Sequence, residues 1–368
     1  MRKIDTVARI GGDEFAIVCE LQSEKGSHGD ELMHFADRVL AAVREPISLN
    51  ASDVEVGASI GIALCPADGD DAETILHAAD IAMYRAKDSG RDTFRFYEQS
   101  MEEELHARVA LEAEVRRAVA ADHIVPYYQP LIHLADGRLV GFEILARWSH
   151  PENGAIPPDV FIPVIEHLGL MGDFTLRLLR RACLDAKAWP PDLRLSLNVS
   201  PPQLKDPVFP ARLLTVLSET GFPPPRLEIE ITETALMTEL ELVKTVLAAL
   251  HDLGVKVALD DFGTGYSSLY HLRELKLDKI KIDKSFIHSM NKNPESTKIV
   301  NAILGLASSL GLPATAEGIE DGEVLKALNK AGCETGQGYL FAKALPAAKA
   351  LAWMHDRALA TSIERKIA

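Results

Sequence analysis

Two neighbouring aspartates, Asp260 and Asp261, end a short apolar run and are the first candidates for chemistry in this sequence. Neighbouring carboxylates at a strand end repel each other unless a cation lies between them. Gly263 and Gly265 follow closely, and glycines let the backbone turn sharply beside such a cation. The same residues also occur in an ordinary solvated turn, so this segment alone leaves a metal site and a turn as alternatives.

The sequence pattern around these residues predicts a barrel of strands and helices that would position them. From Asp122 to the C-terminus, short β-type runs alternate with helical stretches, and the segment has about the length of an eight-stranded βα barrel. The runs that we expect to form strands are 126–132, 140–148, 193–199, 227–232, 255–260, 279–283, 313–317 and 333–341. The main helices are expected at 174–189, 237–253, 296–310 and 322–331. We therefore predict an α/β fold with a TIM-like (β/α)8 barrel.

Chemistry in such a barrel gathers at the carboxyl ends of its strands. All but one of the expected strand ends carry a polar residue, whose burial would be costly without a partner. These residues are Glu143, Asn198, Glu230, Asp260 with Asp261, Lys281, Glu317 and Gln337. Each could singly be a helix cap or a satisfied core group, and Lys281 could extend to solvent, but their recurrence in phase favours a site. Oxygen ligands without histidine or cysteine indicate Mg²⁺ or Mn²⁺ rather than zinc.

At these residues the segment from about Leu111 onward resembles an EAL-domain cyclic di-GMP phosphodiesterase. The name-giving motif stands here as Glu143-Ile144-Leu145, with isoleucine where the family usually has alanine. On an alternating strand Ile144 would point away from the metal face, so the change concerns packing rather than ligation. The other motifs that follow the family order are Tyr128-Gln129-Pro130, Asn198-Val199-Ser200, Glu230-Ile231-Thr232-Glu233, 259–269, Lys281-Ile282-Asp283, 316–320 and Gln337-Gly338-Tyr339.

The resemblance implies a two-metal hydrolase that converts cyclic di-GMP to linear pGpG. The positions that would hold the first Mg²⁺ or Mn²⁺ ion are Glu143, Asn198, Glu230 and Asp260. Those that would hold the second are Asp260, Asp261 and Glu317, so that Asp260 bridges. Two such ions about 3.5–4 Å apart can share a hydroxide and stabilise the leaving 3′ oxygen.

The resemblance assigns further roles around the metals. The catalytic group would be Lys281, Glu317 and Gln337, with Lys281 orienting and deprotonating the attacking water and Gln337 touching that water or the phosphate. Gln129 and Arg147 would contact phosphate or guanine. Two other positions imply support: Glu233 would anchor the loop 261–269, and Glu320 would stabilise the site from behind the ligands.

Residues 1–98 predict a small α+β segment before the barrel. Apolar runs on both sides of Gly11-Gly12 are typical of a β-hairpin, and a helix, a strand, a helix and a closing strand are expected at 30–45, 54–63, 72–87 and 93–97. The segment resembles the GGDEF domain of diguanylate cyclases, whose signature stands here as residues 11–15. That domain opens with a strand and helices before the hairpin, so the resemblance implies a partial domain without cyclase activity.

Arg2 and Asp5 precede the hairpin at the spacing at which the GGDEF family places its product-inhibition site for cyclic di-GMP. The alternative is an ordinary charged pair near a chain end. Residues 99–121 have the apolar stripe and charged face of an amphipathic helix, which we expect to connect the two parts. The expected domains are therefore a partial GGDEF domain at 1–98, the connector at 99–121 and an EAL barrel at 122–368.

The bulk composition excludes some partners. A net charge of −15, from 39 basic and 54 acidic residues, argues against a nucleic acid polymer because phosphate neutralisation needs a basic surface. The cysteines, which are Cys19, Cys65, Cys183 and Cys333, show no paired spacing, so neither zinc nor disulfides are indicated. No apolar run reaches the length of a membrane span. We expect a cytoplasmic chain, although a full-length parent could be membrane-anchored.

Two other functions compete with the phosphodiesterase. A catalytically silent receptor of the same fold would bind cyclic di-GMP and regulate a partner, but such receptors usually lose a metal ligand or the lysine, and none is lost here. Mg²⁺-dependent enolisation would need an acid/base pair across the barrel mouth that the sequence does not provide. The resemblance leaves a homodimer through the barrel as an open expectation.

Overall fold

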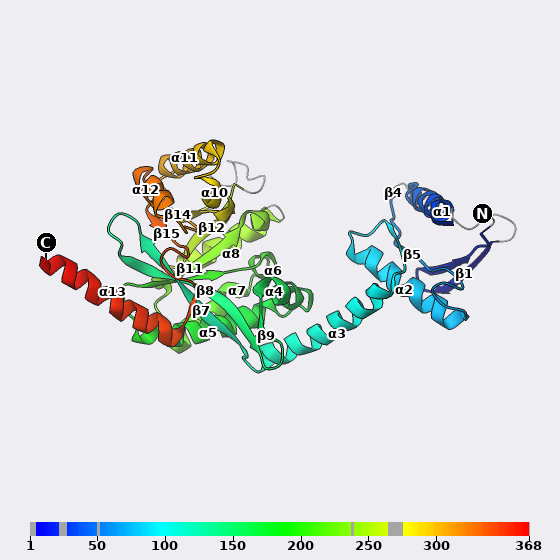
Figure 1. Cartoon of the computed structure of the whole chain (residues 1–368), viewed down its shortest axis with the longest axis horizontal. Helices are drawn as coiled ribbons and strands as arrows, with labels where there is room; N and C mark the ends of the chain where they lie inside the picture. The colour runs from blue at the N-terminus through cyan, green and yellow to red at the C-terminus, as the bar shows by residue number, and fades with distance from the viewer. Residues whose placement is uncertain (1–4, 22–27, 50–51, 237–238, 264–274, 368) are drawn as a thin grey trace. The chain divides into compact units, whose positions relative to one another are not determined.

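The computed structural model describes residues 5–21, 28–49, 52–236, 239–263 and 275–367 (Figure 1). The chain divides into two compact units, Met1–Leu111 and Glu112–Ala368. The boundary between them lies within the long helix α3 (Gln99–Ala120).

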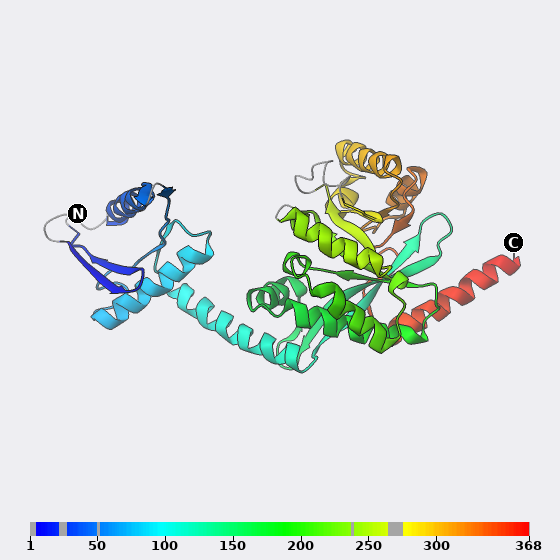
Figure 2. The ribbon, with the colours of Figure 1, turned by 180° about the vertical axis from the view of Figure 1, so that it is seen from behind.

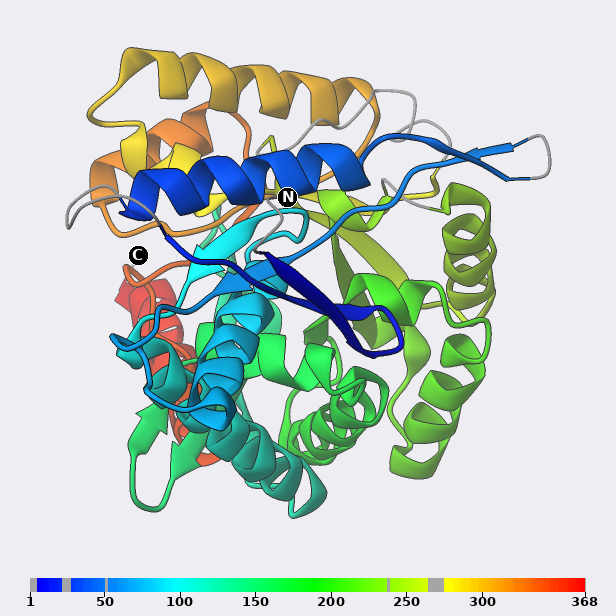
Figure 3. The same cartoon turned by 90° about the vertical axis from the view of Figure 1, so that its right-hand side faces the viewer.

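The N-terminal unit combines short strands with two helices. Its elements are β1 (Thr6–Gly11), β2 (Glu14–Val18), α1 (His28–Val43), β3 (Ile47–Leu49), β4 (Ser52–Val54), β5 (Ile60–Ile62), α2 (Ala72–Asp88) and β6 (Phe94–Phe96). The expected hairpin is present as the antiparallel β1–β2 ribbon, which is visible with α1 in Figure 3. The sequence did not predict the β3–β4 ribbon, because its short strands are exposed and carry no burial pattern.

The C-terminal unit contains a closed barrel of eight strands, as expected. In barrel order the strands are β7 (Ile124–His133), β15 (Thr335–Gly336), β14 (Ala314–Ala316), β13 (Lys279–Ile282), β12 (Lys256–Phe262), β11 (Leu227–Thr232), β10 (Arg194–Asn198) and β8 (Leu139–His150). Pairing between β7 and β8 closes the ring. The consecutive parallel strands are buried almost throughout, which explains their continuous apolar runs.

Strand β7 departs from a regular (β/α)8 pattern. It runs antiparallel to both of its barrel neighbours, β8 and β15. The physical reason is the short turn at residues 134–138, because a parallel partner needs a crossover of about a dozen residues or more. Two short strands, β9 (Gly154–Ile156) and β16 (Leu345–Pro346), extend the sheet from β8 and β7.

Helices cover the outside of the strands. The longer ones are α4 (Pro158–His167), α5 (Met171–Asp185), α7 (Phe209–Thr220), α8 (Leu240–Asp252), α11 (Pro294–Ser309), α12 (Gly322–Lys330) and α13 (Ala347–Ile367), with short α6 (Pro201–Leu204) and α10 (Lys284–Ser289). Helices α11 and α12 (gold and orange) lie over one side of the strands and α5 and α7 (green) over another (Figure 2). N-caps define the starts of α11 and α12: the side chains of Asn293 and Asp321 each accept a hydrogen bond from the backbone N–H two residues later.

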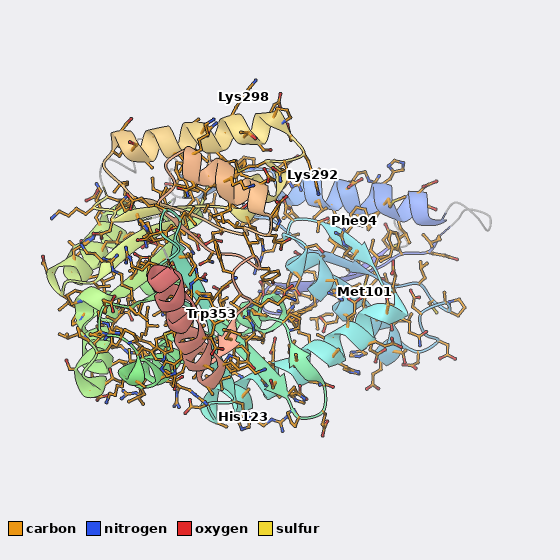
Figure 4. All side chains as sticks on the ribbon, turned by 60° about the vertical axis from the view of Figure 1, so that its left-hand side comes forward. Phe94, Met101, His123, Lys292, Lys298 and Trp353 are labelled. Atoms are coloured by element: carbon orange, nitrogen blue, oxygen red, sulfur yellow. The ribbon has the colours of Figure 1, made fainter. Side chains whose placement is uncertain are left out.

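An aromatic cluster fills the space between strands β7 and β8 and the helices outside them. The rings of Tyr128 and Trp189 are 4.8 Å apart in an edge-to-face arrangement, and Phe142 lies 4.8 Å from Trp189. Trp353, labelled on α13 in Figure 4, adds a fourth ring 6.4 Å from Phe142. These residues of β7 and β8 face outward, toward the covering helices. Because side chains alternate along a strand, the residues between them point into the barrel interior.

Candidate active site

Four carboxylates, three from strands β8, β11 and β12 and one from directly after β14, meet around one ammonium inside the barrel. The Nζ atom of Lys281 lies 2.5 Å from Glu317 Oε1, 2.6 Å from Glu230 Oε2 and 3.1 Å from Asp260 Oδ2. The Oε1 atom of Glu143 is 3.9 Å away. Lys281 is 1 % exposed, so these charges interact in a largely water-free environment. We call these five residues the carboxylate layer.

Strand alternation explains why Lys281 points into this layer. Ile280 and Ile282 flank it on β13 and, on a pleated strand, face the opposite side, toward the covering helices. The next residue, Asp283, accepts the backbone N–H of Ser285 at 2.9 Å and starts helix α10. The strand therefore ends just beyond Lys281, at the carboxyl edge of the barrel. The N–H of Glu317 bonds to Ile282 O at 3.2 Å and fixes Glu317 at the same edge.

A bulge in β12 brings two successive aspartates to this edge. The pairing with β13 shifts between Leu259 and Phe262, and Asp261 has a left-handed φ of 54°. Asp261 N–H donates to Asp260 Oδ1 at 2.9 Å. Residues next to each other on a regular strand face opposite sides, so the bulge is what lets both carboxylates serve one site. Burial, then the Asp260 and Asp283 carboxylates, raise the pKa of Asp261 to about 6.

Amide side chains hold Glu143 from two sides. Asn198 Nδ2 donates to Glu143 Oε1 at 2.8 Å, and Gln337 Nε2 donates to Glu143 Oε2 at 2.6 Å. The position of Gln337 depends on Gly338, where a Cβ atom would lie 2.1 Å from the carbonyl oxygen of Ile319. A glycine is therefore needed for this close approach of the two backbones.

When its acids are ionised, the carboxylate layer carries more negative charge than its ammonium can balance. Burial is the main cause that raises the pKa of Glu317 to about 8 and that of Glu230 well above its ordinary value, and the neighbouring carboxylates act in the same direction. Burial alone would lower the pKa of Lys281, but the four surrounding carboxylates raise it. With Asp261 included, five carboxylates face one ammonium, which leaves four negative charges when all are ionised.

These residues fit hard divalent cations. Their donors are carboxylate and amide oxygens, the ligands that Mg²⁺ and Mn²⁺ prefer. Two divalent ions would balance the four surplus charges. Glu230 Oε1 and Gln337 Oε1 are buried without a hydrogen-bond partner among the described residues, so each has an oxygen available. No three His, Cys, Asp or Glu side chains of the described ranges already surround a common ion position.

The expected substrate-binding residues lie near the same edge. Gln129 is buried on β7 in register with Glu143, and its Nε2 donates to Ala342 O at 3.4 Å. Arg147 is half-buried on β8, donates to the carbonyl of Ala146, and has its guanidinium 6.0 Å from the ring centre of Tyr127. Their contacts to phosphate or guanine stay a prediction.

The other expected residues have different surroundings. Glu233 is buried directly after β11, and most of the loop that it was expected to anchor, from 264, lies outside the described residues. Glu320 is half-exposed and lies 3.7 Å from His288 Nε2. Asp5 is half-buried at the start of the hairpin, whereas Arg2 lies outside the described residues.

Sequence reasoning missed a second charged pair inside the barrel. Lys279 Nζ lies 2.7 Å from Glu228 Oε1, and both side chains are buried. Ser196 Oγ donates to the same oxygen at 3.1 Å. The signal was present, because Glu228 and Lys279 stand two positions before Glu230 and Lys281, and alternation puts residues two apart on one face.

Comparison with known families agrees with this geometry. Residues 112–344 match the family model of the EAL domain. The chain belongs to the EAL domain family. Residues 1–93 match the model of the diguanylate cyclase GGDEF domain. Both matches confirm the resemblances inferred from the sequence motifs.

The relatives include enzymes and solved complexes. The chain is 35 % identical over 352 residues to the cyclic di-GMP phosphodiesterase NbdA of Pseudomonas aeruginosa, with 95 % of this chain and 44 % of the relative covered. It is 36 % identical over 350 residues to the cyclic di-GMP phosphodiesterase PdeR of Escherichia coli, covering 94 % and 52 %. The solved PaMucR phosphodiesterase in complex with c-di-GMP is 32 % identical with a TM-score of 0.63, covering 65 % of this chain and 99 % of that one.

The chain spans about half the length of the curated relatives it matches. None of the helices within the described ranges is long and apolar enough to cross a membrane.

Proposed function

We propose that the barrel hydrolyses cyclic di-GMP to linear 5′-pGpG in a reaction that depends on two Mg²⁺ or Mn²⁺ ions. The observation that carries the proposal is the carboxylate layer, in which acidic side chains from separate strands converge at the carboxyl edge with a surplus of negative charge. The relatives NbdA and PdeR, which are named as cyclic di-GMP phosphodiesterases, support the substrate.

The metal ligands in this proposal come from six side chains. Glu143, Asn198, Glu230 and Asp260 would hold one ion, and Asp260, Asp261 and Glu317 the other. When bound, such ions would activate a water molecule for attack and stabilise the leaving oxygen. The amide contacts from Asn198 and Gln337 keep Glu143 turned toward the layer.

Lys281 is placed to handle the proton of the attacking water. While the four carboxylates are ionised and unshared, Nζ keeps its proton because their charge raises its pKa. If bound cations balanced that charge, burial would dominate, lower the pKa of Lys281 and let Nζ accept a proton. Gln337 Oε1, which is buried without a hydrogen-bond partner among the described residues, is available for the same water or the phosphate.

The proposal is tested by incubating the purified protein with cyclic di-GMP and Mn²⁺ and separating the products chromatographically. We expect pGpG as the first product, and EDTA should abolish its formation. An unchanged rate in EDTA would contradict the metal requirement.

A receptor without catalysis is the second candidate, because the fold also includes proteins that bind c-di-GMP, such as the FimX EAL domain. Calorimetric binding of cyclic di-GMP together with no pGpG in the Mn²⁺ assay would favour the receptor. The complete set of strand-end ligands favours the enzyme.

A further inference from the structure

A buried, charge-balanced pair lies directly beneath the carboxylate layer. Glu228 is 2 % and Lys279 is 5 % exposed, and their side chains meet at 2.7 Å. The two residues come from β11 and β13, so the contact crosses the intervening strand β12 inside the barrel. The residue of β12 that pairs in register with Lys279 is the small Ala258. We call Glu228 and Lys279 the lower pair.

The backbone register offers Lys279 another carboxylate. Lys279 pairs with Ala258, and Ala258 pairs with Glu230, so Lys279 and Glu230 share one register line across β12. Adjacent strands are about 4.8 Å apart, and a lysine side chain can reach across two such steps. Lys281 makes a crossing of the same kind to reach Glu230. Glu228 is therefore one of two carboxylates within reach of Lys279, and Glu230 is the other.

We propose that Glu228 is a positioning residue that holds the ammonium of Lys279 below the carboxylate layer and so keeps Glu230 available for a divalent cation. This inference rests on the proposed metal-dependent function. Without Glu228, the buried ammonium of Lys279 would turn to the surplus negative charge of the carboxylate layer. Glu230 would then be shared by two lysines, and a metal ion would have to displace one of them.

The test measures binding of Mn²⁺ rather than turnover. The probe is Mn²⁺ alone, followed by the melting temperature of the protein and by the electron paramagnetic resonance signal of free Mn²⁺. We expect Glu228→Gln to raise the Mn²⁺ concentration at half-saturation about 10-fold or more, the range seen when a residue behind a metal ligand is lost. Lys279→Met should change it less than about 3-fold, and Glu228→Gln/Lys279→Met should return to within about 3-fold of the wild type.

This asymmetry separates positioning from a general structural role. Breaking a buried ion pair from either side destabilises a protein, so a purely structural pair would respond alike to both single substitutions. Equal Mn²⁺ responses of Glu228→Gln and Lys279→Met, or no recovery in the double variant, would overturn the proposal. Ser196→Ala is the matched control, since it removes a neutral donor from the same Glu228 oxygen and should leave the Mn²⁺ midpoint unchanged.

Two further outcomes are decisive. If Glu228→Gln does not fold, Glu228→Asp keeps the charge but draws the carboxylate away from Nζ. It should shift the midpoint in the same direction by about 3-fold, and an unchanged midpoint would count against the proposal. Absence of any Mn²⁺ response in the wild type would refute the proposed metal site and this inference with it, whereas a normal wild-type response with symmetric variants refutes the inference alone.

Discussion

Strands β12 and β13 belong to an acid–base cluster at each end of the barrel. At the amino end, Asp278 accepts hydrogen bonds from Lys256 Nζ at 2.7 Å and from the N–H of Val257 at 2.9 Å, and it lies 2.9 Å from His251 Nε2. At the carboxyl end, Asp260 and Lys281 belong to the carboxylate layer. The first cluster gives one carboxylate several donors, and the second gives one ammonium several carboxylates.

The two clusters have opposite effects on their acids. Burial acts to raise the pKa of Asp278, but the hydrogen bonds from Lys256, Val257 and His251 together hold it below its ordinary value. In the carboxylate layer the pKa of Glu317 rises to about 8. A carboxylate whose partners satisfy it stabilises the fold, whereas a group of acids left short of positive charge can accept cations. The comparison separates a cluster that stabilises the fold from one that we propose to be functional.

The largest effect should come from Lys281→Met, which removes the ammonium and keeps most of the side-chain volume. We expect hydrolysis of cyclic di-GMP to fall about 100- to 10,000-fold, the usual contribution of a group that transfers a proton, while cyclic di-GMP binding persists. Steady-state kinetics and calorimetry measure the two effects. Lys256→Met, at the other end, is the control and should retain turnover. Loss of turnover in both variants would contradict the distinction between the two ends of the barrel.

The next effect concerns metal binding and Asp260→Asn. A concentration of Mn²⁺ about 100 times its Kd should stabilise the wild type by about 2.7 kcal/mol, because the ion binds the folded state. Asp260→Asn removes the carboxylate expected to bridge both ions, so most of this stabilisation should disappear. Thermal unfolding with and without Mn²⁺ measures it. Asp278→Asn should keep the Mn²⁺ response, and an equal loss in both variants would show that the two ends do not differ.

A third prediction concerns pH. Because the pKa of Glu317 is raised to about 8, the metal-free folded state holds a proton that the unfolded chain releases near 4.5. Stability without metal should therefore fall as pH rises between these values. A cation must displace that proton, so apparent Mn²⁺ affinity should increase up to about 10-fold per pH unit below 8. Titration calorimetry in buffers of different ionisation enthalpy counts the released protons, and zero protons at pH 7 would contradict the assignment.

The smallest effect should be that of Asp278→Asn on stability. The substitution weakens hydrogen bonds to charged donors, so the free energy of unfolding at neutral pH should drop by about 1–2 kcal/mol. Since the folded pKa of Asp278 lies below its ordinary value of 3.8, its contribution is complete above that value and is lost as pH falls through the folded pKa. Urea unfolding at pH 7 and below pH 3.8 measures the difference, which should shrink in acid. A difference that stays constant with pH would argue against a charged Asp278.

Much of the barrel could be predicted because short β-type runs recur between helical stretches along the sequence. Each expected barrel strand is present, although the run 333–341 forms only the two-residue β15, and the strand-end positions of Glu230, Asp260 and Lys281 do come together. The antiparallel direction of β7 could also have been predicted, since residues 134–138 are too few for a crossover helix.

Other features depend on distances that spacing does not contain. Spacing along the chain does not decide which carboxylate Lys279 contacts, because Glu230 lies on its register line while its Nζ bonds to Glu228. The bulge at Asp261 requires a left-handed backbone at a non-glycine residue, for which no local sequence rule applies. The position of Glu320 in a sequence motif did not indicate how exposed its side chain is, and the structure places it half-exposed beside His288.

The most direct test is a crystal structure of the protein soaked in Mn²⁺, with anomalous diffraction measured near the manganese edge. We predict two peaks about 3.5–4 Å apart, with Asp260 between them and Glu143, Glu230 and Glu317 among their ligands. Anomalous peaks only at other positions, or none beside these carboxylates at saturating Mn²⁺, would contradict the account.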